Sequence, residues 1–185
     1  MRRFGIERQA QLIAFIPILV IATLLESYFI YARFDDLDRA HLERSQLLTR
    51  QLASSSEYAV FSGDAVLLKQ HVDLTMSFQD VQGIQILDPA FNPLLKVGQV
   101  ERSLITPHPD KSQLDQSKQL LRLYEPILAT QINLNEIGRT VESERTATKP
   151  LGMVIIEFSK KRLNKQKTDI VVLNILISLV ILSVA

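Results

Sequence analysis

Hydrophobic residues are concentrated at the two ends of this chain. Residues 12–32 (LIAFIPILVIATLLESYFIYA) form an apolar stretch with a single charge, Glu26. A helix rises about 1.5 Å per residue, so the stretch is long enough to cross the roughly 30 Å hydrocarbon core of a bilayer. Residues 170–185 are also apolar but stop short of a full crossing. The pattern predicts two transmembrane helices, the second of them truncated.

The middle of the chain changes from helical to strand-like periodicity. Residues 33–59 lack glycine and proline and repeat leucine at helical spacing, which predicts a helix continuous with the first span. Residues 61–64 (FSGD) interrupt it, and Asp64 is a suitable N-cap for a second helix at 65–76. Strands are expected at residues 83–87, 94–97, 120–127 and 151–158, with a loop at 99–118 and a mobile insertion at 129–149.

Flanking charges set the expected topology. Residues 1–11 are rich in arginine, and a short basic flank favours the cytoplasm. A cleaved signal peptide is the alternative, but large aromatic residues stand where a cleavage site would need small ones. The basic residues between positions 160 and 167 oppose this topology, although long loops cross a membrane largely regardless of charge. Residues 33–169, with equal numbers of basic and acidic residues, are therefore expected outside the cytoplasm.

Glu26 is the one charged residue of the first apolar stretch. A carboxylate at the bilayer centre costs about 3 kcal/mol, and much less near the interface. Two interpretations are open for this residue. Its side chain can reach the headgroup region, or it can make a polar contact between helices of a bundle.

Composition excludes several classes of function. The chain has no cysteine, so disulfides and thiolate metal sites are excluded. A net charge of +1 gives no reason to expect a nucleic-acid partner. The three histidines lack metal-ligand spacing, and no phosphate-binding glycine loop or nucleophile motif occurs. We therefore expect no catalytic residues, no metal and no cofactor.

Arg122 and Tyr124 share one face of the strand expected at 120–127. A guanidinium fork and a phenol can together bind a carboxylate ligand. The alternative is that Arg122 pairs with Glu125 or Glu157 on a solvated face. His71, on the short helix, can join as a pH-sensitive partner or lie on an exposed helix face.

The order of helices and strands resembles the Cache (extracellular PAS-like) sensor domains. At the residue level the chain is similar to the amino-terminal part of the BarA/GacS group of hybrid sensor histidine kinases. The segments that carry this similarity are LASSSEYAVFSGD (residues 52–64), VQGIQILDPAFNPLLKVG (81–98), LYEPI (123–127) and LGMVIIEFS (151–159). Ser56, Glu57 and Tyr58 match the family's segment, and we interpret them as a structural junction between helices.

The resemblance implies an α+β fold: a PAS/Cache-like antiparallel sheet with a long N-terminal helix, flanked by two transmembrane helices. It implies a bacterial inner-membrane protein with residues 33–169 periplasmic, a homodimer, and a small carboxylate as ligand. The kinase domains of that family have no counterpart in these residues, so any kinase activity would belong to a longer parent. Two alternatives remain: a sensor attached to a diguanylate cyclase or chemoreceptor, and a membrane scaffold that binds no ligand.

Overall fold

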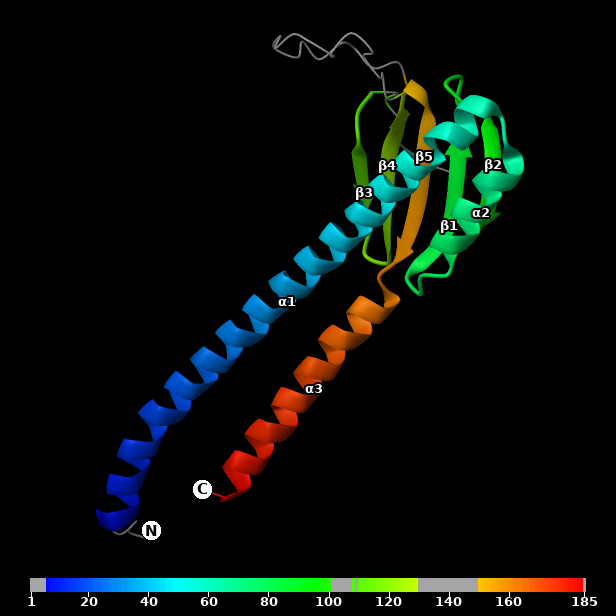
Figure 1. The fold of residues 1–185 in the computed structure, drawn as a ribbon. Helices are drawn as coiled ribbons and strands as arrows, with labels where there is room; N and C mark the ends of the chain where they lie inside the picture. Colours follow the sequence, from blue (N-terminus) through cyan, green and yellow to red (C-terminus); the bar gives the residue numbers. More distant parts are fainter. Residues whose placement is uncertain (1–5, 101–107, 109, 130–149, 185) are drawn as a thin grey trace, which may run out of the picture. The chain divides into compact units, whose positions relative to one another are not determined.

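The computed structural model describes residues 6–100, 108, 110–129 and 150–184. The elements in chain order are α1 (Ile6–Ser62), α2 (Ala65–Met76), β1 (Val81–Leu87), β2 (Pro93–Gly98), β3 (Gln113–Gln116), β4 (Leu120–Leu128), β5 (Pro150–Ser159) and α3 (Lys161–Val184) (Figure 1). They form two compact units, which are described separately. One unit is Met1–His41 with Leu163–Ala185, and the other is Leu42–Arg162.

The long N-terminal helix is continuous, as its sequence predicts. It ends where Gly63 takes a left-handed φ of 72°, a conformation that glycine adopts without the steric cost of a Cβ. The Asp64 amide then closes the helix by donating to the Ala59 carbonyl at 2.9 Å. The Asp64 carboxylate accepts from the amides of Val66 and Leu67, both at 3.0 Å, which confirms it as the N-cap of α2.

A five-stranded antiparallel sheet follows, in the order β2-β1-β5-β4-β3. All four strands expected from the sequence are present, so the α+β class with a long N-terminal helix is confirmed. The strand β5 occupies the centre and is buried over most of its length. Its sequence, PLGMVIIEFS, explains that position, because a strand covered on both faces reads as a nearly continuous apolar run.

The fifth strand, β3, falls in residues that the sequence assigned to a loop, and that assignment was wrong. Its sequence QLDQ contains a single apolar residue, Leu114, which is itself exposed, so its side chains carry no strand periodicity. The strand exists because its backbone pairs with β4 at the edge of the sheet. Of the insertion predicted at 129–149, residues 130–149 lie outside the described residues.

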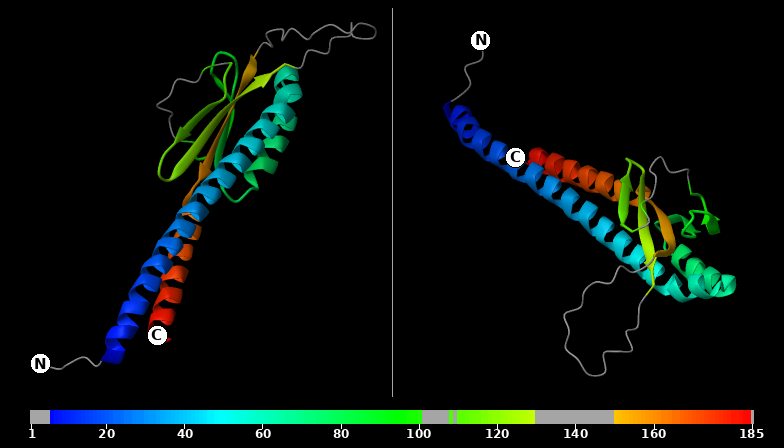
Figure 2. Two further views of the ribbon diagram at one scale, coloured as in Figure 1. Left: turned by 90° about the vertical axis from the view of Figure 1, so that its left-hand side faces the viewer. Right: turned by 90° about the horizontal axis from the view of Figure 1, so that it is seen from above.

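The two faces of the sheet have different cover. On one face, α2 and the second half of α1 pack over the strands (Figure 2). The core there joins both helices to the sheet and includes Leu52, Leu68, Val72, Ile84, Ile86, Leu121, Leu123, Val154, Ile156 and Phe158. Successive side chains of a strand point to opposite faces. The residues between these, including Leu87, Tyr124, Met153 and Ile155, therefore form a second, smaller cluster on the face without helices.

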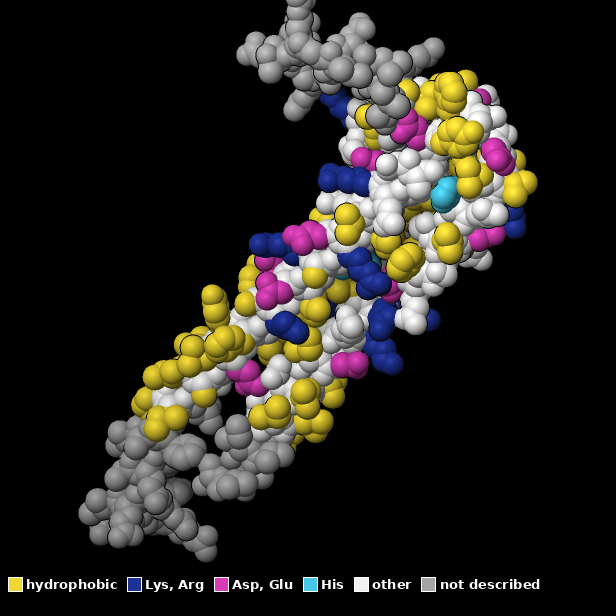
Figure 3. All heavy atoms as spheres, in the orientation of Figure 1, with side chains coloured by type: hydrophobic (Ala, Val, Ile, Leu, Met, Phe, Trp, Pro, Cys, Tyr) yellow, Lys and Arg dark blue, Asp and Glu magenta, His cyan; other side chains and the backbone are white. Residues whose placement is uncertain are grey.

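In the other unit, the first part of α1 and α3 run antiparallel. Lys167 of α3 bonds both carboxylate oxygens of Asp38 on α1, at 2.6 and 2.7 Å, and its ammonium lies 5.4 Å from the ring centre of Phe34. Most large apolar side chains in the apolar stretches of this unit are exposed, as the yellow spheres along both helices in Figure 3 show. By length and composition, α1 alone of the described helices is apolar enough to cross a membrane, with a mean hydropathy of 1.5.

Candidate functional site

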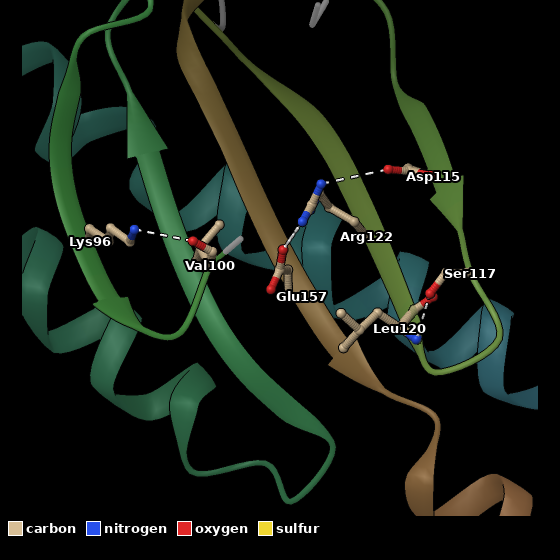
Figure 4. Close-up of polar contacts among 7 residues, drawn as sticks. All are labelled: Lys96, Val100, Asp115, Ser117, Leu120, Arg122 and Glu157. Carbon is tan, nitrogen blue, oxygen red and sulfur yellow. Dashed lines mark hydrogen bonds and ion pairs between the residues drawn. The ribbon is translucent and has the colours of Figure 1, made fainter. Parts of the chain in front are cut away.

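The helix-free face of the sheet carries a buried charged cluster. The Arg122 Nε on β4 donates to Oε1 of Glu157 on β5 at 2.6 Å, and its Nη2 donates to the same oxygen. The side chains of the pair are 9% and 1% exposed. Asp115 of β3 lies on the other side, with its Oδ2 3.6 Å from Arg122 Nη1 (Figure 4). Three adjacent strands thus contribute one cation and two carboxylates.

Strand register explains this arrangement. Arg122 stands opposite Asp115 in the β3–β4 pair and opposite Glu157 in the β4–β5 pair. Side chains directly opposite one another in an antiparallel pair lie on the same face, with Cβ atoms about 4.5–5.5 Å apart. The three groups meet because β4 lies between β3 and β5, and Figure 4 shows them in front of the sheet with the helices behind.

The cluster keeps Arg122 charged. Burial by itself lowers the pKa of the guanidinium, but hydrogen bonds to Glu157 and Tyr124 favour the charged form and outweigh it, so the pKa lies above its usual value. A guanidinium has five N–H donors in a fixed fork. Glu157 and Tyr124 are hydrogen-bonded to Arg122, and Asp115 lies close to the remaining edge of the guanidinium. An incoming anion would therefore have to compete with these three groups for the N–H donors of Arg122.

The structure brings together two of the three residues predicted to contact a ligand. Arg122 and Tyr124 lie on the same face and are hydrogen-bonded, and Tyr124 is completely buried. His71 is on α2, which packs over the opposite face of the sheet. Whether any of the three binds a ligand stays a prediction.

Glu157 is the ion-pair partner of Arg122, as one alternative proposed, but the solvated face assumed for that pair is wrong. Both side chains are buried. The other suggested partner, Glu125, instead lies 3.8 Å from Arg50 of α1. The sequence signal for burial was the position of Glu157 within LGMVIIEF, because a carboxylate in a buried apolar strand requires a partner. Asp115 carried no such signal, since it lay in the expected loop.

The residues predicted to form a helical junction occupy three different environments. Ser56 is completely buried on the sheet side of α1, and its hydroxyl has no hydrogen-bond partner among the described residues. Glu57 is half-buried, whereas Tyr58 is 68% exposed. Ser45, Thr49 and Ala53 are buried on the same side of α1 as Ser56. The junction role of residues 56–58 stays a prediction, and the buried side of the helix near them combines small side chains with Leu52.

Glu26 makes a contact between helices, one of the two alternatives left open for it. The Ser178 hydroxyl of α3 lies 2.9 Å from each carboxylate oxygen of Glu26. A cavity of about 480 Å³ adjoins the contact and is lined by Glu26, Phe29, Ile30, Arg33, Ile170 and Asn174. The seam between α1 and α3 therefore combines the polar side chains of Glu26, Asn174 and Ser178 with apolar ones such as Ile30 and Ile170.

Comparison with known proteins agrees with this fold. The family model for single Cache domain 4 matches residues 31–168. The sensor histidine kinase GacS of Pseudomonas protegens is 26% identical over 109 residues, which make up 59% of this chain and 12% of that protein. The chain thus matches only a small part of the length of this relative.

Proposed function

The chain belongs to the single Cache domain 4 family, and on that basis we propose that it is the extracytoplasmic sensing portion of a membrane-bound sensor histidine kinase. The similarity to GacS supports the kinase as the output. Kinase activity itself would reside in a longer parent, because neither the Cache region nor the two helices carry a predicted catalytic residue. The Cache unit would detect a signal, and the helices that adjoin it would transmit the result.

One observation supports this proposal most directly: both ends of the Cache unit continue into helices that expose their apolar side chains. Exposed apolar surface of this extent is typical of contact with lipid or with another protein. Within the apolar stretches of the two helices whose burial is described, residues 16–32 of α1 and 170–179 of α3, the half-buried polar residues are Glu26, Asn174 and Ser178. Helices paired in a bilayer typically place their polar groups toward the partner helix and their apolar groups outward.

We assign residues 1–11 to the cytoplasm, 12–32 to a first transmembrane helix, 33–169 to a periplasmic sensor and 170–185 to a second span. The protein would then lie in the bacterial inner membrane and contact lipid along both helices. A homodimer is the expected assembly. Exposed Tyr58 and Phe61 on α1 are available on the sensor unit for such a contact.

The helix-free face of the sheet is the proposed ligand site, and a small carboxylate the proposed ligand. Such a ligand would bind Arg122 and Tyr124 in place of Glu157. Removing one partner from a buried ion pair costs about 3–5 kcal/mol, because the remaining charge is left uncompensated. Competition of this size would make binding weak unless the ligand also compensates Glu157, which favours a ligand that carries both a carboxylate and a hydrogen-bond donor.

A thermal-shift screen of residues 1–185 in detergent tests the ligand proposal. Small mono- and dicarboxylates with and without an amino or hydroxyl group are added, and the unfolding temperature is recorded. A true ligand should raise that temperature in the wild type and in His71→Ala, but not in Tyr124→Phe. Loss of the shift in His71→Ala alone would place the site on the helix-covered face.

A scaffold without a ligand is the alternative function. It predicts that no carboxylate shifts the unfolding temperature of any variant, while the membrane topology stays as assigned. The topology is tested separately by single cysteines in the cysteine-free chain, reacted in spheroplasts with an impermeant maleimide. Cysteines at Lys69 and Lys96 should react, and cysteines at Leu25 and Leu176 should be protected.

A further inference from the structure

Glu26 has two polar side chains of α3 within the same seam. Ser178 bonds to it in the structure, and Asn174 lines the cavity that Glu26 also lines. Residues four apart on a helix lie on the same face, one above the other, so Asn174 and Ser178 point to the same side of α3. They are separated along the helix axis by about 6 Å.

The two helices are held in one register by two polar contacts. Glu26 and Asp38 are twelve residues apart on α1, and their partners Ser178 and Lys167 are eleven residues apart on α3. At 1.5 Å per residue the contacts lie about 17 Å apart on each helix, so both are satisfied at once only in this alignment. A change of register must break or exchange both.

Lys167 also has two partners spaced one turn apart. Its ammonium bonds Asp38 and lies over the ring of Phe34, four residues earlier on α1. If α3 moved by one turn toward its own C-terminal end, Asn174 would reach the level of Glu26. The same movement would bring Lys167 to the level of Phe34. A polar or cation–π contact would then exist at each position in both registers.

We propose that Glu26 is a two-position latch, which bonds Ser178 in the register seen here and Asn174 after a shift of one helical turn. The inference rests on the proposed function, in that α3 is taken to lie in the membrane beside α1. Inside a bilayer a carboxylate is costly without a hydrogen-bond partner, so positions between the two registers are disfavoured. The cavity beside Glu26 leaves room for Asn174 to approach. The latch would convert a continuous sliding motion into two discrete states.

Spin-label distances in the intact chain test the latch. Residues 1–185 contain no cysteine, so Tyr31→Cys and Leu179→Cys, both at exposed positions, introduce the only label sites. In the present register the two sites are offset by about 9 Å along the helix axes, and by about 15 Å after a one-turn shift. In lipid nanodiscs, Ser178→Ala should therefore lengthen the main label distance by up to about 6 Å.

Matched variants separate the latch from general loosening of the helix pair. Ser27→Ala removes a hydroxyl next to Glu26 that bonds Thr23 within α1, and should leave the distance unchanged. Asn174→Leu should retain the shorter distance and abolish the lengthening caused by Ser178→Ala. An unchanged distance in Ser178→Ala would overturn the latch, as would an equal lengthening when Glu26→Leu is also present.

Failure of the latch and failure of the proposed function give different results. The control is Leu176→Cys treated with an impermeant maleimide in the same nanodiscs. A protected cysteine together with an unchanged label distance overturns the latch alone. A reactive cysteine shows that α3 is outside the bilayer and overturns both the second span and the latch.

Discussion

Arg122→Met should destabilise the sensor unit strongly. The substitution keeps a side chain of similar length but removes the guanidinium, and so leaves the Glu157 carboxylate, 1% exposed, without its cation. Breaking a buried pair in this way costs about 3–5 kcal/mol. For a unit of this size the loss corresponds to a fall in Tm of roughly 10–20 °C.

Two further variants identify the origin of that loss. Glu157→Gln keeps a hydrogen-bonding group and leaves Arg122 beside Asp115, so its cost should be smaller, about 1.5–3 kcal/mol. The double variant Arg122→Met with Glu157→Leu removes both charges and should recover most of the lost stability, since apolar replacement of a buried pair is often nearly neutral. Urea unfolding followed by circular dichroism measures all three. The reasoning is refuted if Arg122→Met lies within about 1 kcal/mol of wild type, or if the double variant is no more stable than the single one.

Four other predictions concern turns and caps. Hydrogen bonds from the side-chain amide and backbone N–H of Asn92 lower the pKa of Asp88 in the folded protein. The stability that these bonds give is therefore present above the unfolded pKa near 3.8 and is lost as pH falls through the lower folded pKa. Asp88→Asn should therefore lose less Tm than wild type between pH 5 and pH 2.5, and an equal loss would contradict this. Gly63→Ala, at positive φ with open space around it, should cost about 1–2 kcal/mol. Gly98→Ala should cost clearly more in urea unfolding, because its Cβ would lie 2.3 Å from a backbone oxygen. Asp64→Ala should cost about 1 kcal/mol by the same measurement, through loss of the α2 N-cap, and a neutral result would exclude that role.

The elements that the sequence predicted correctly are those whose periodicity comes from burial. Helix α1 lacks helix-breaking residues between positions 33 and 59, and β5 is apolar because it is buried over most of its length at the centre of the sheet. Asp64 was predictable because a cap is a local interaction between a side chain and the next turn. Strand β3 was not, because the polar sequence QLDQ carries no apolar pattern of its own and the strand forms by backbone pairing with the neighbouring strand β4.

The sequence predicted only those parts of the candidate site that follow from a local pattern. Neighbouring positions on one strand, such as Arg122 and Tyr124, are visible from alternation alone. The contributions of Glu157 and Asp115 depend on strand pairing and register, which place both side chains opposite Arg122. The placement of His71 on the opposite face likewise depends on which side of the sheet α2 packs against, and no local pattern specifies that side.

Glu157 would give the proposed ligand site a direct covalent route to α3. It lies near the end of β5, and only Phe158, Ser159 and Lys160 separate it from the first residue of α3. Lys160 is itself held to the β3–β4 hairpin, since its Nζ donates to the Ser117 carbonyl at 3.0 Å and its amide to the Gln119 carbonyl at 2.9 Å.

A ligand that took Arg122 from Glu157 would leave a buried carboxylate in the strand that leads into α3. The free energy available for signalling is the difference in ligand-binding free energy between two arrangements, one with Arg122 and Glu157 paired and one with them unpaired. Breaking the pair sets the scale of that difference at about 3–5 kcal/mol. A ligand whose affinity is the same in Glu157→Gln and wild type would draw no energy from this pair, and its signal would have to reach α3 by another strand contact.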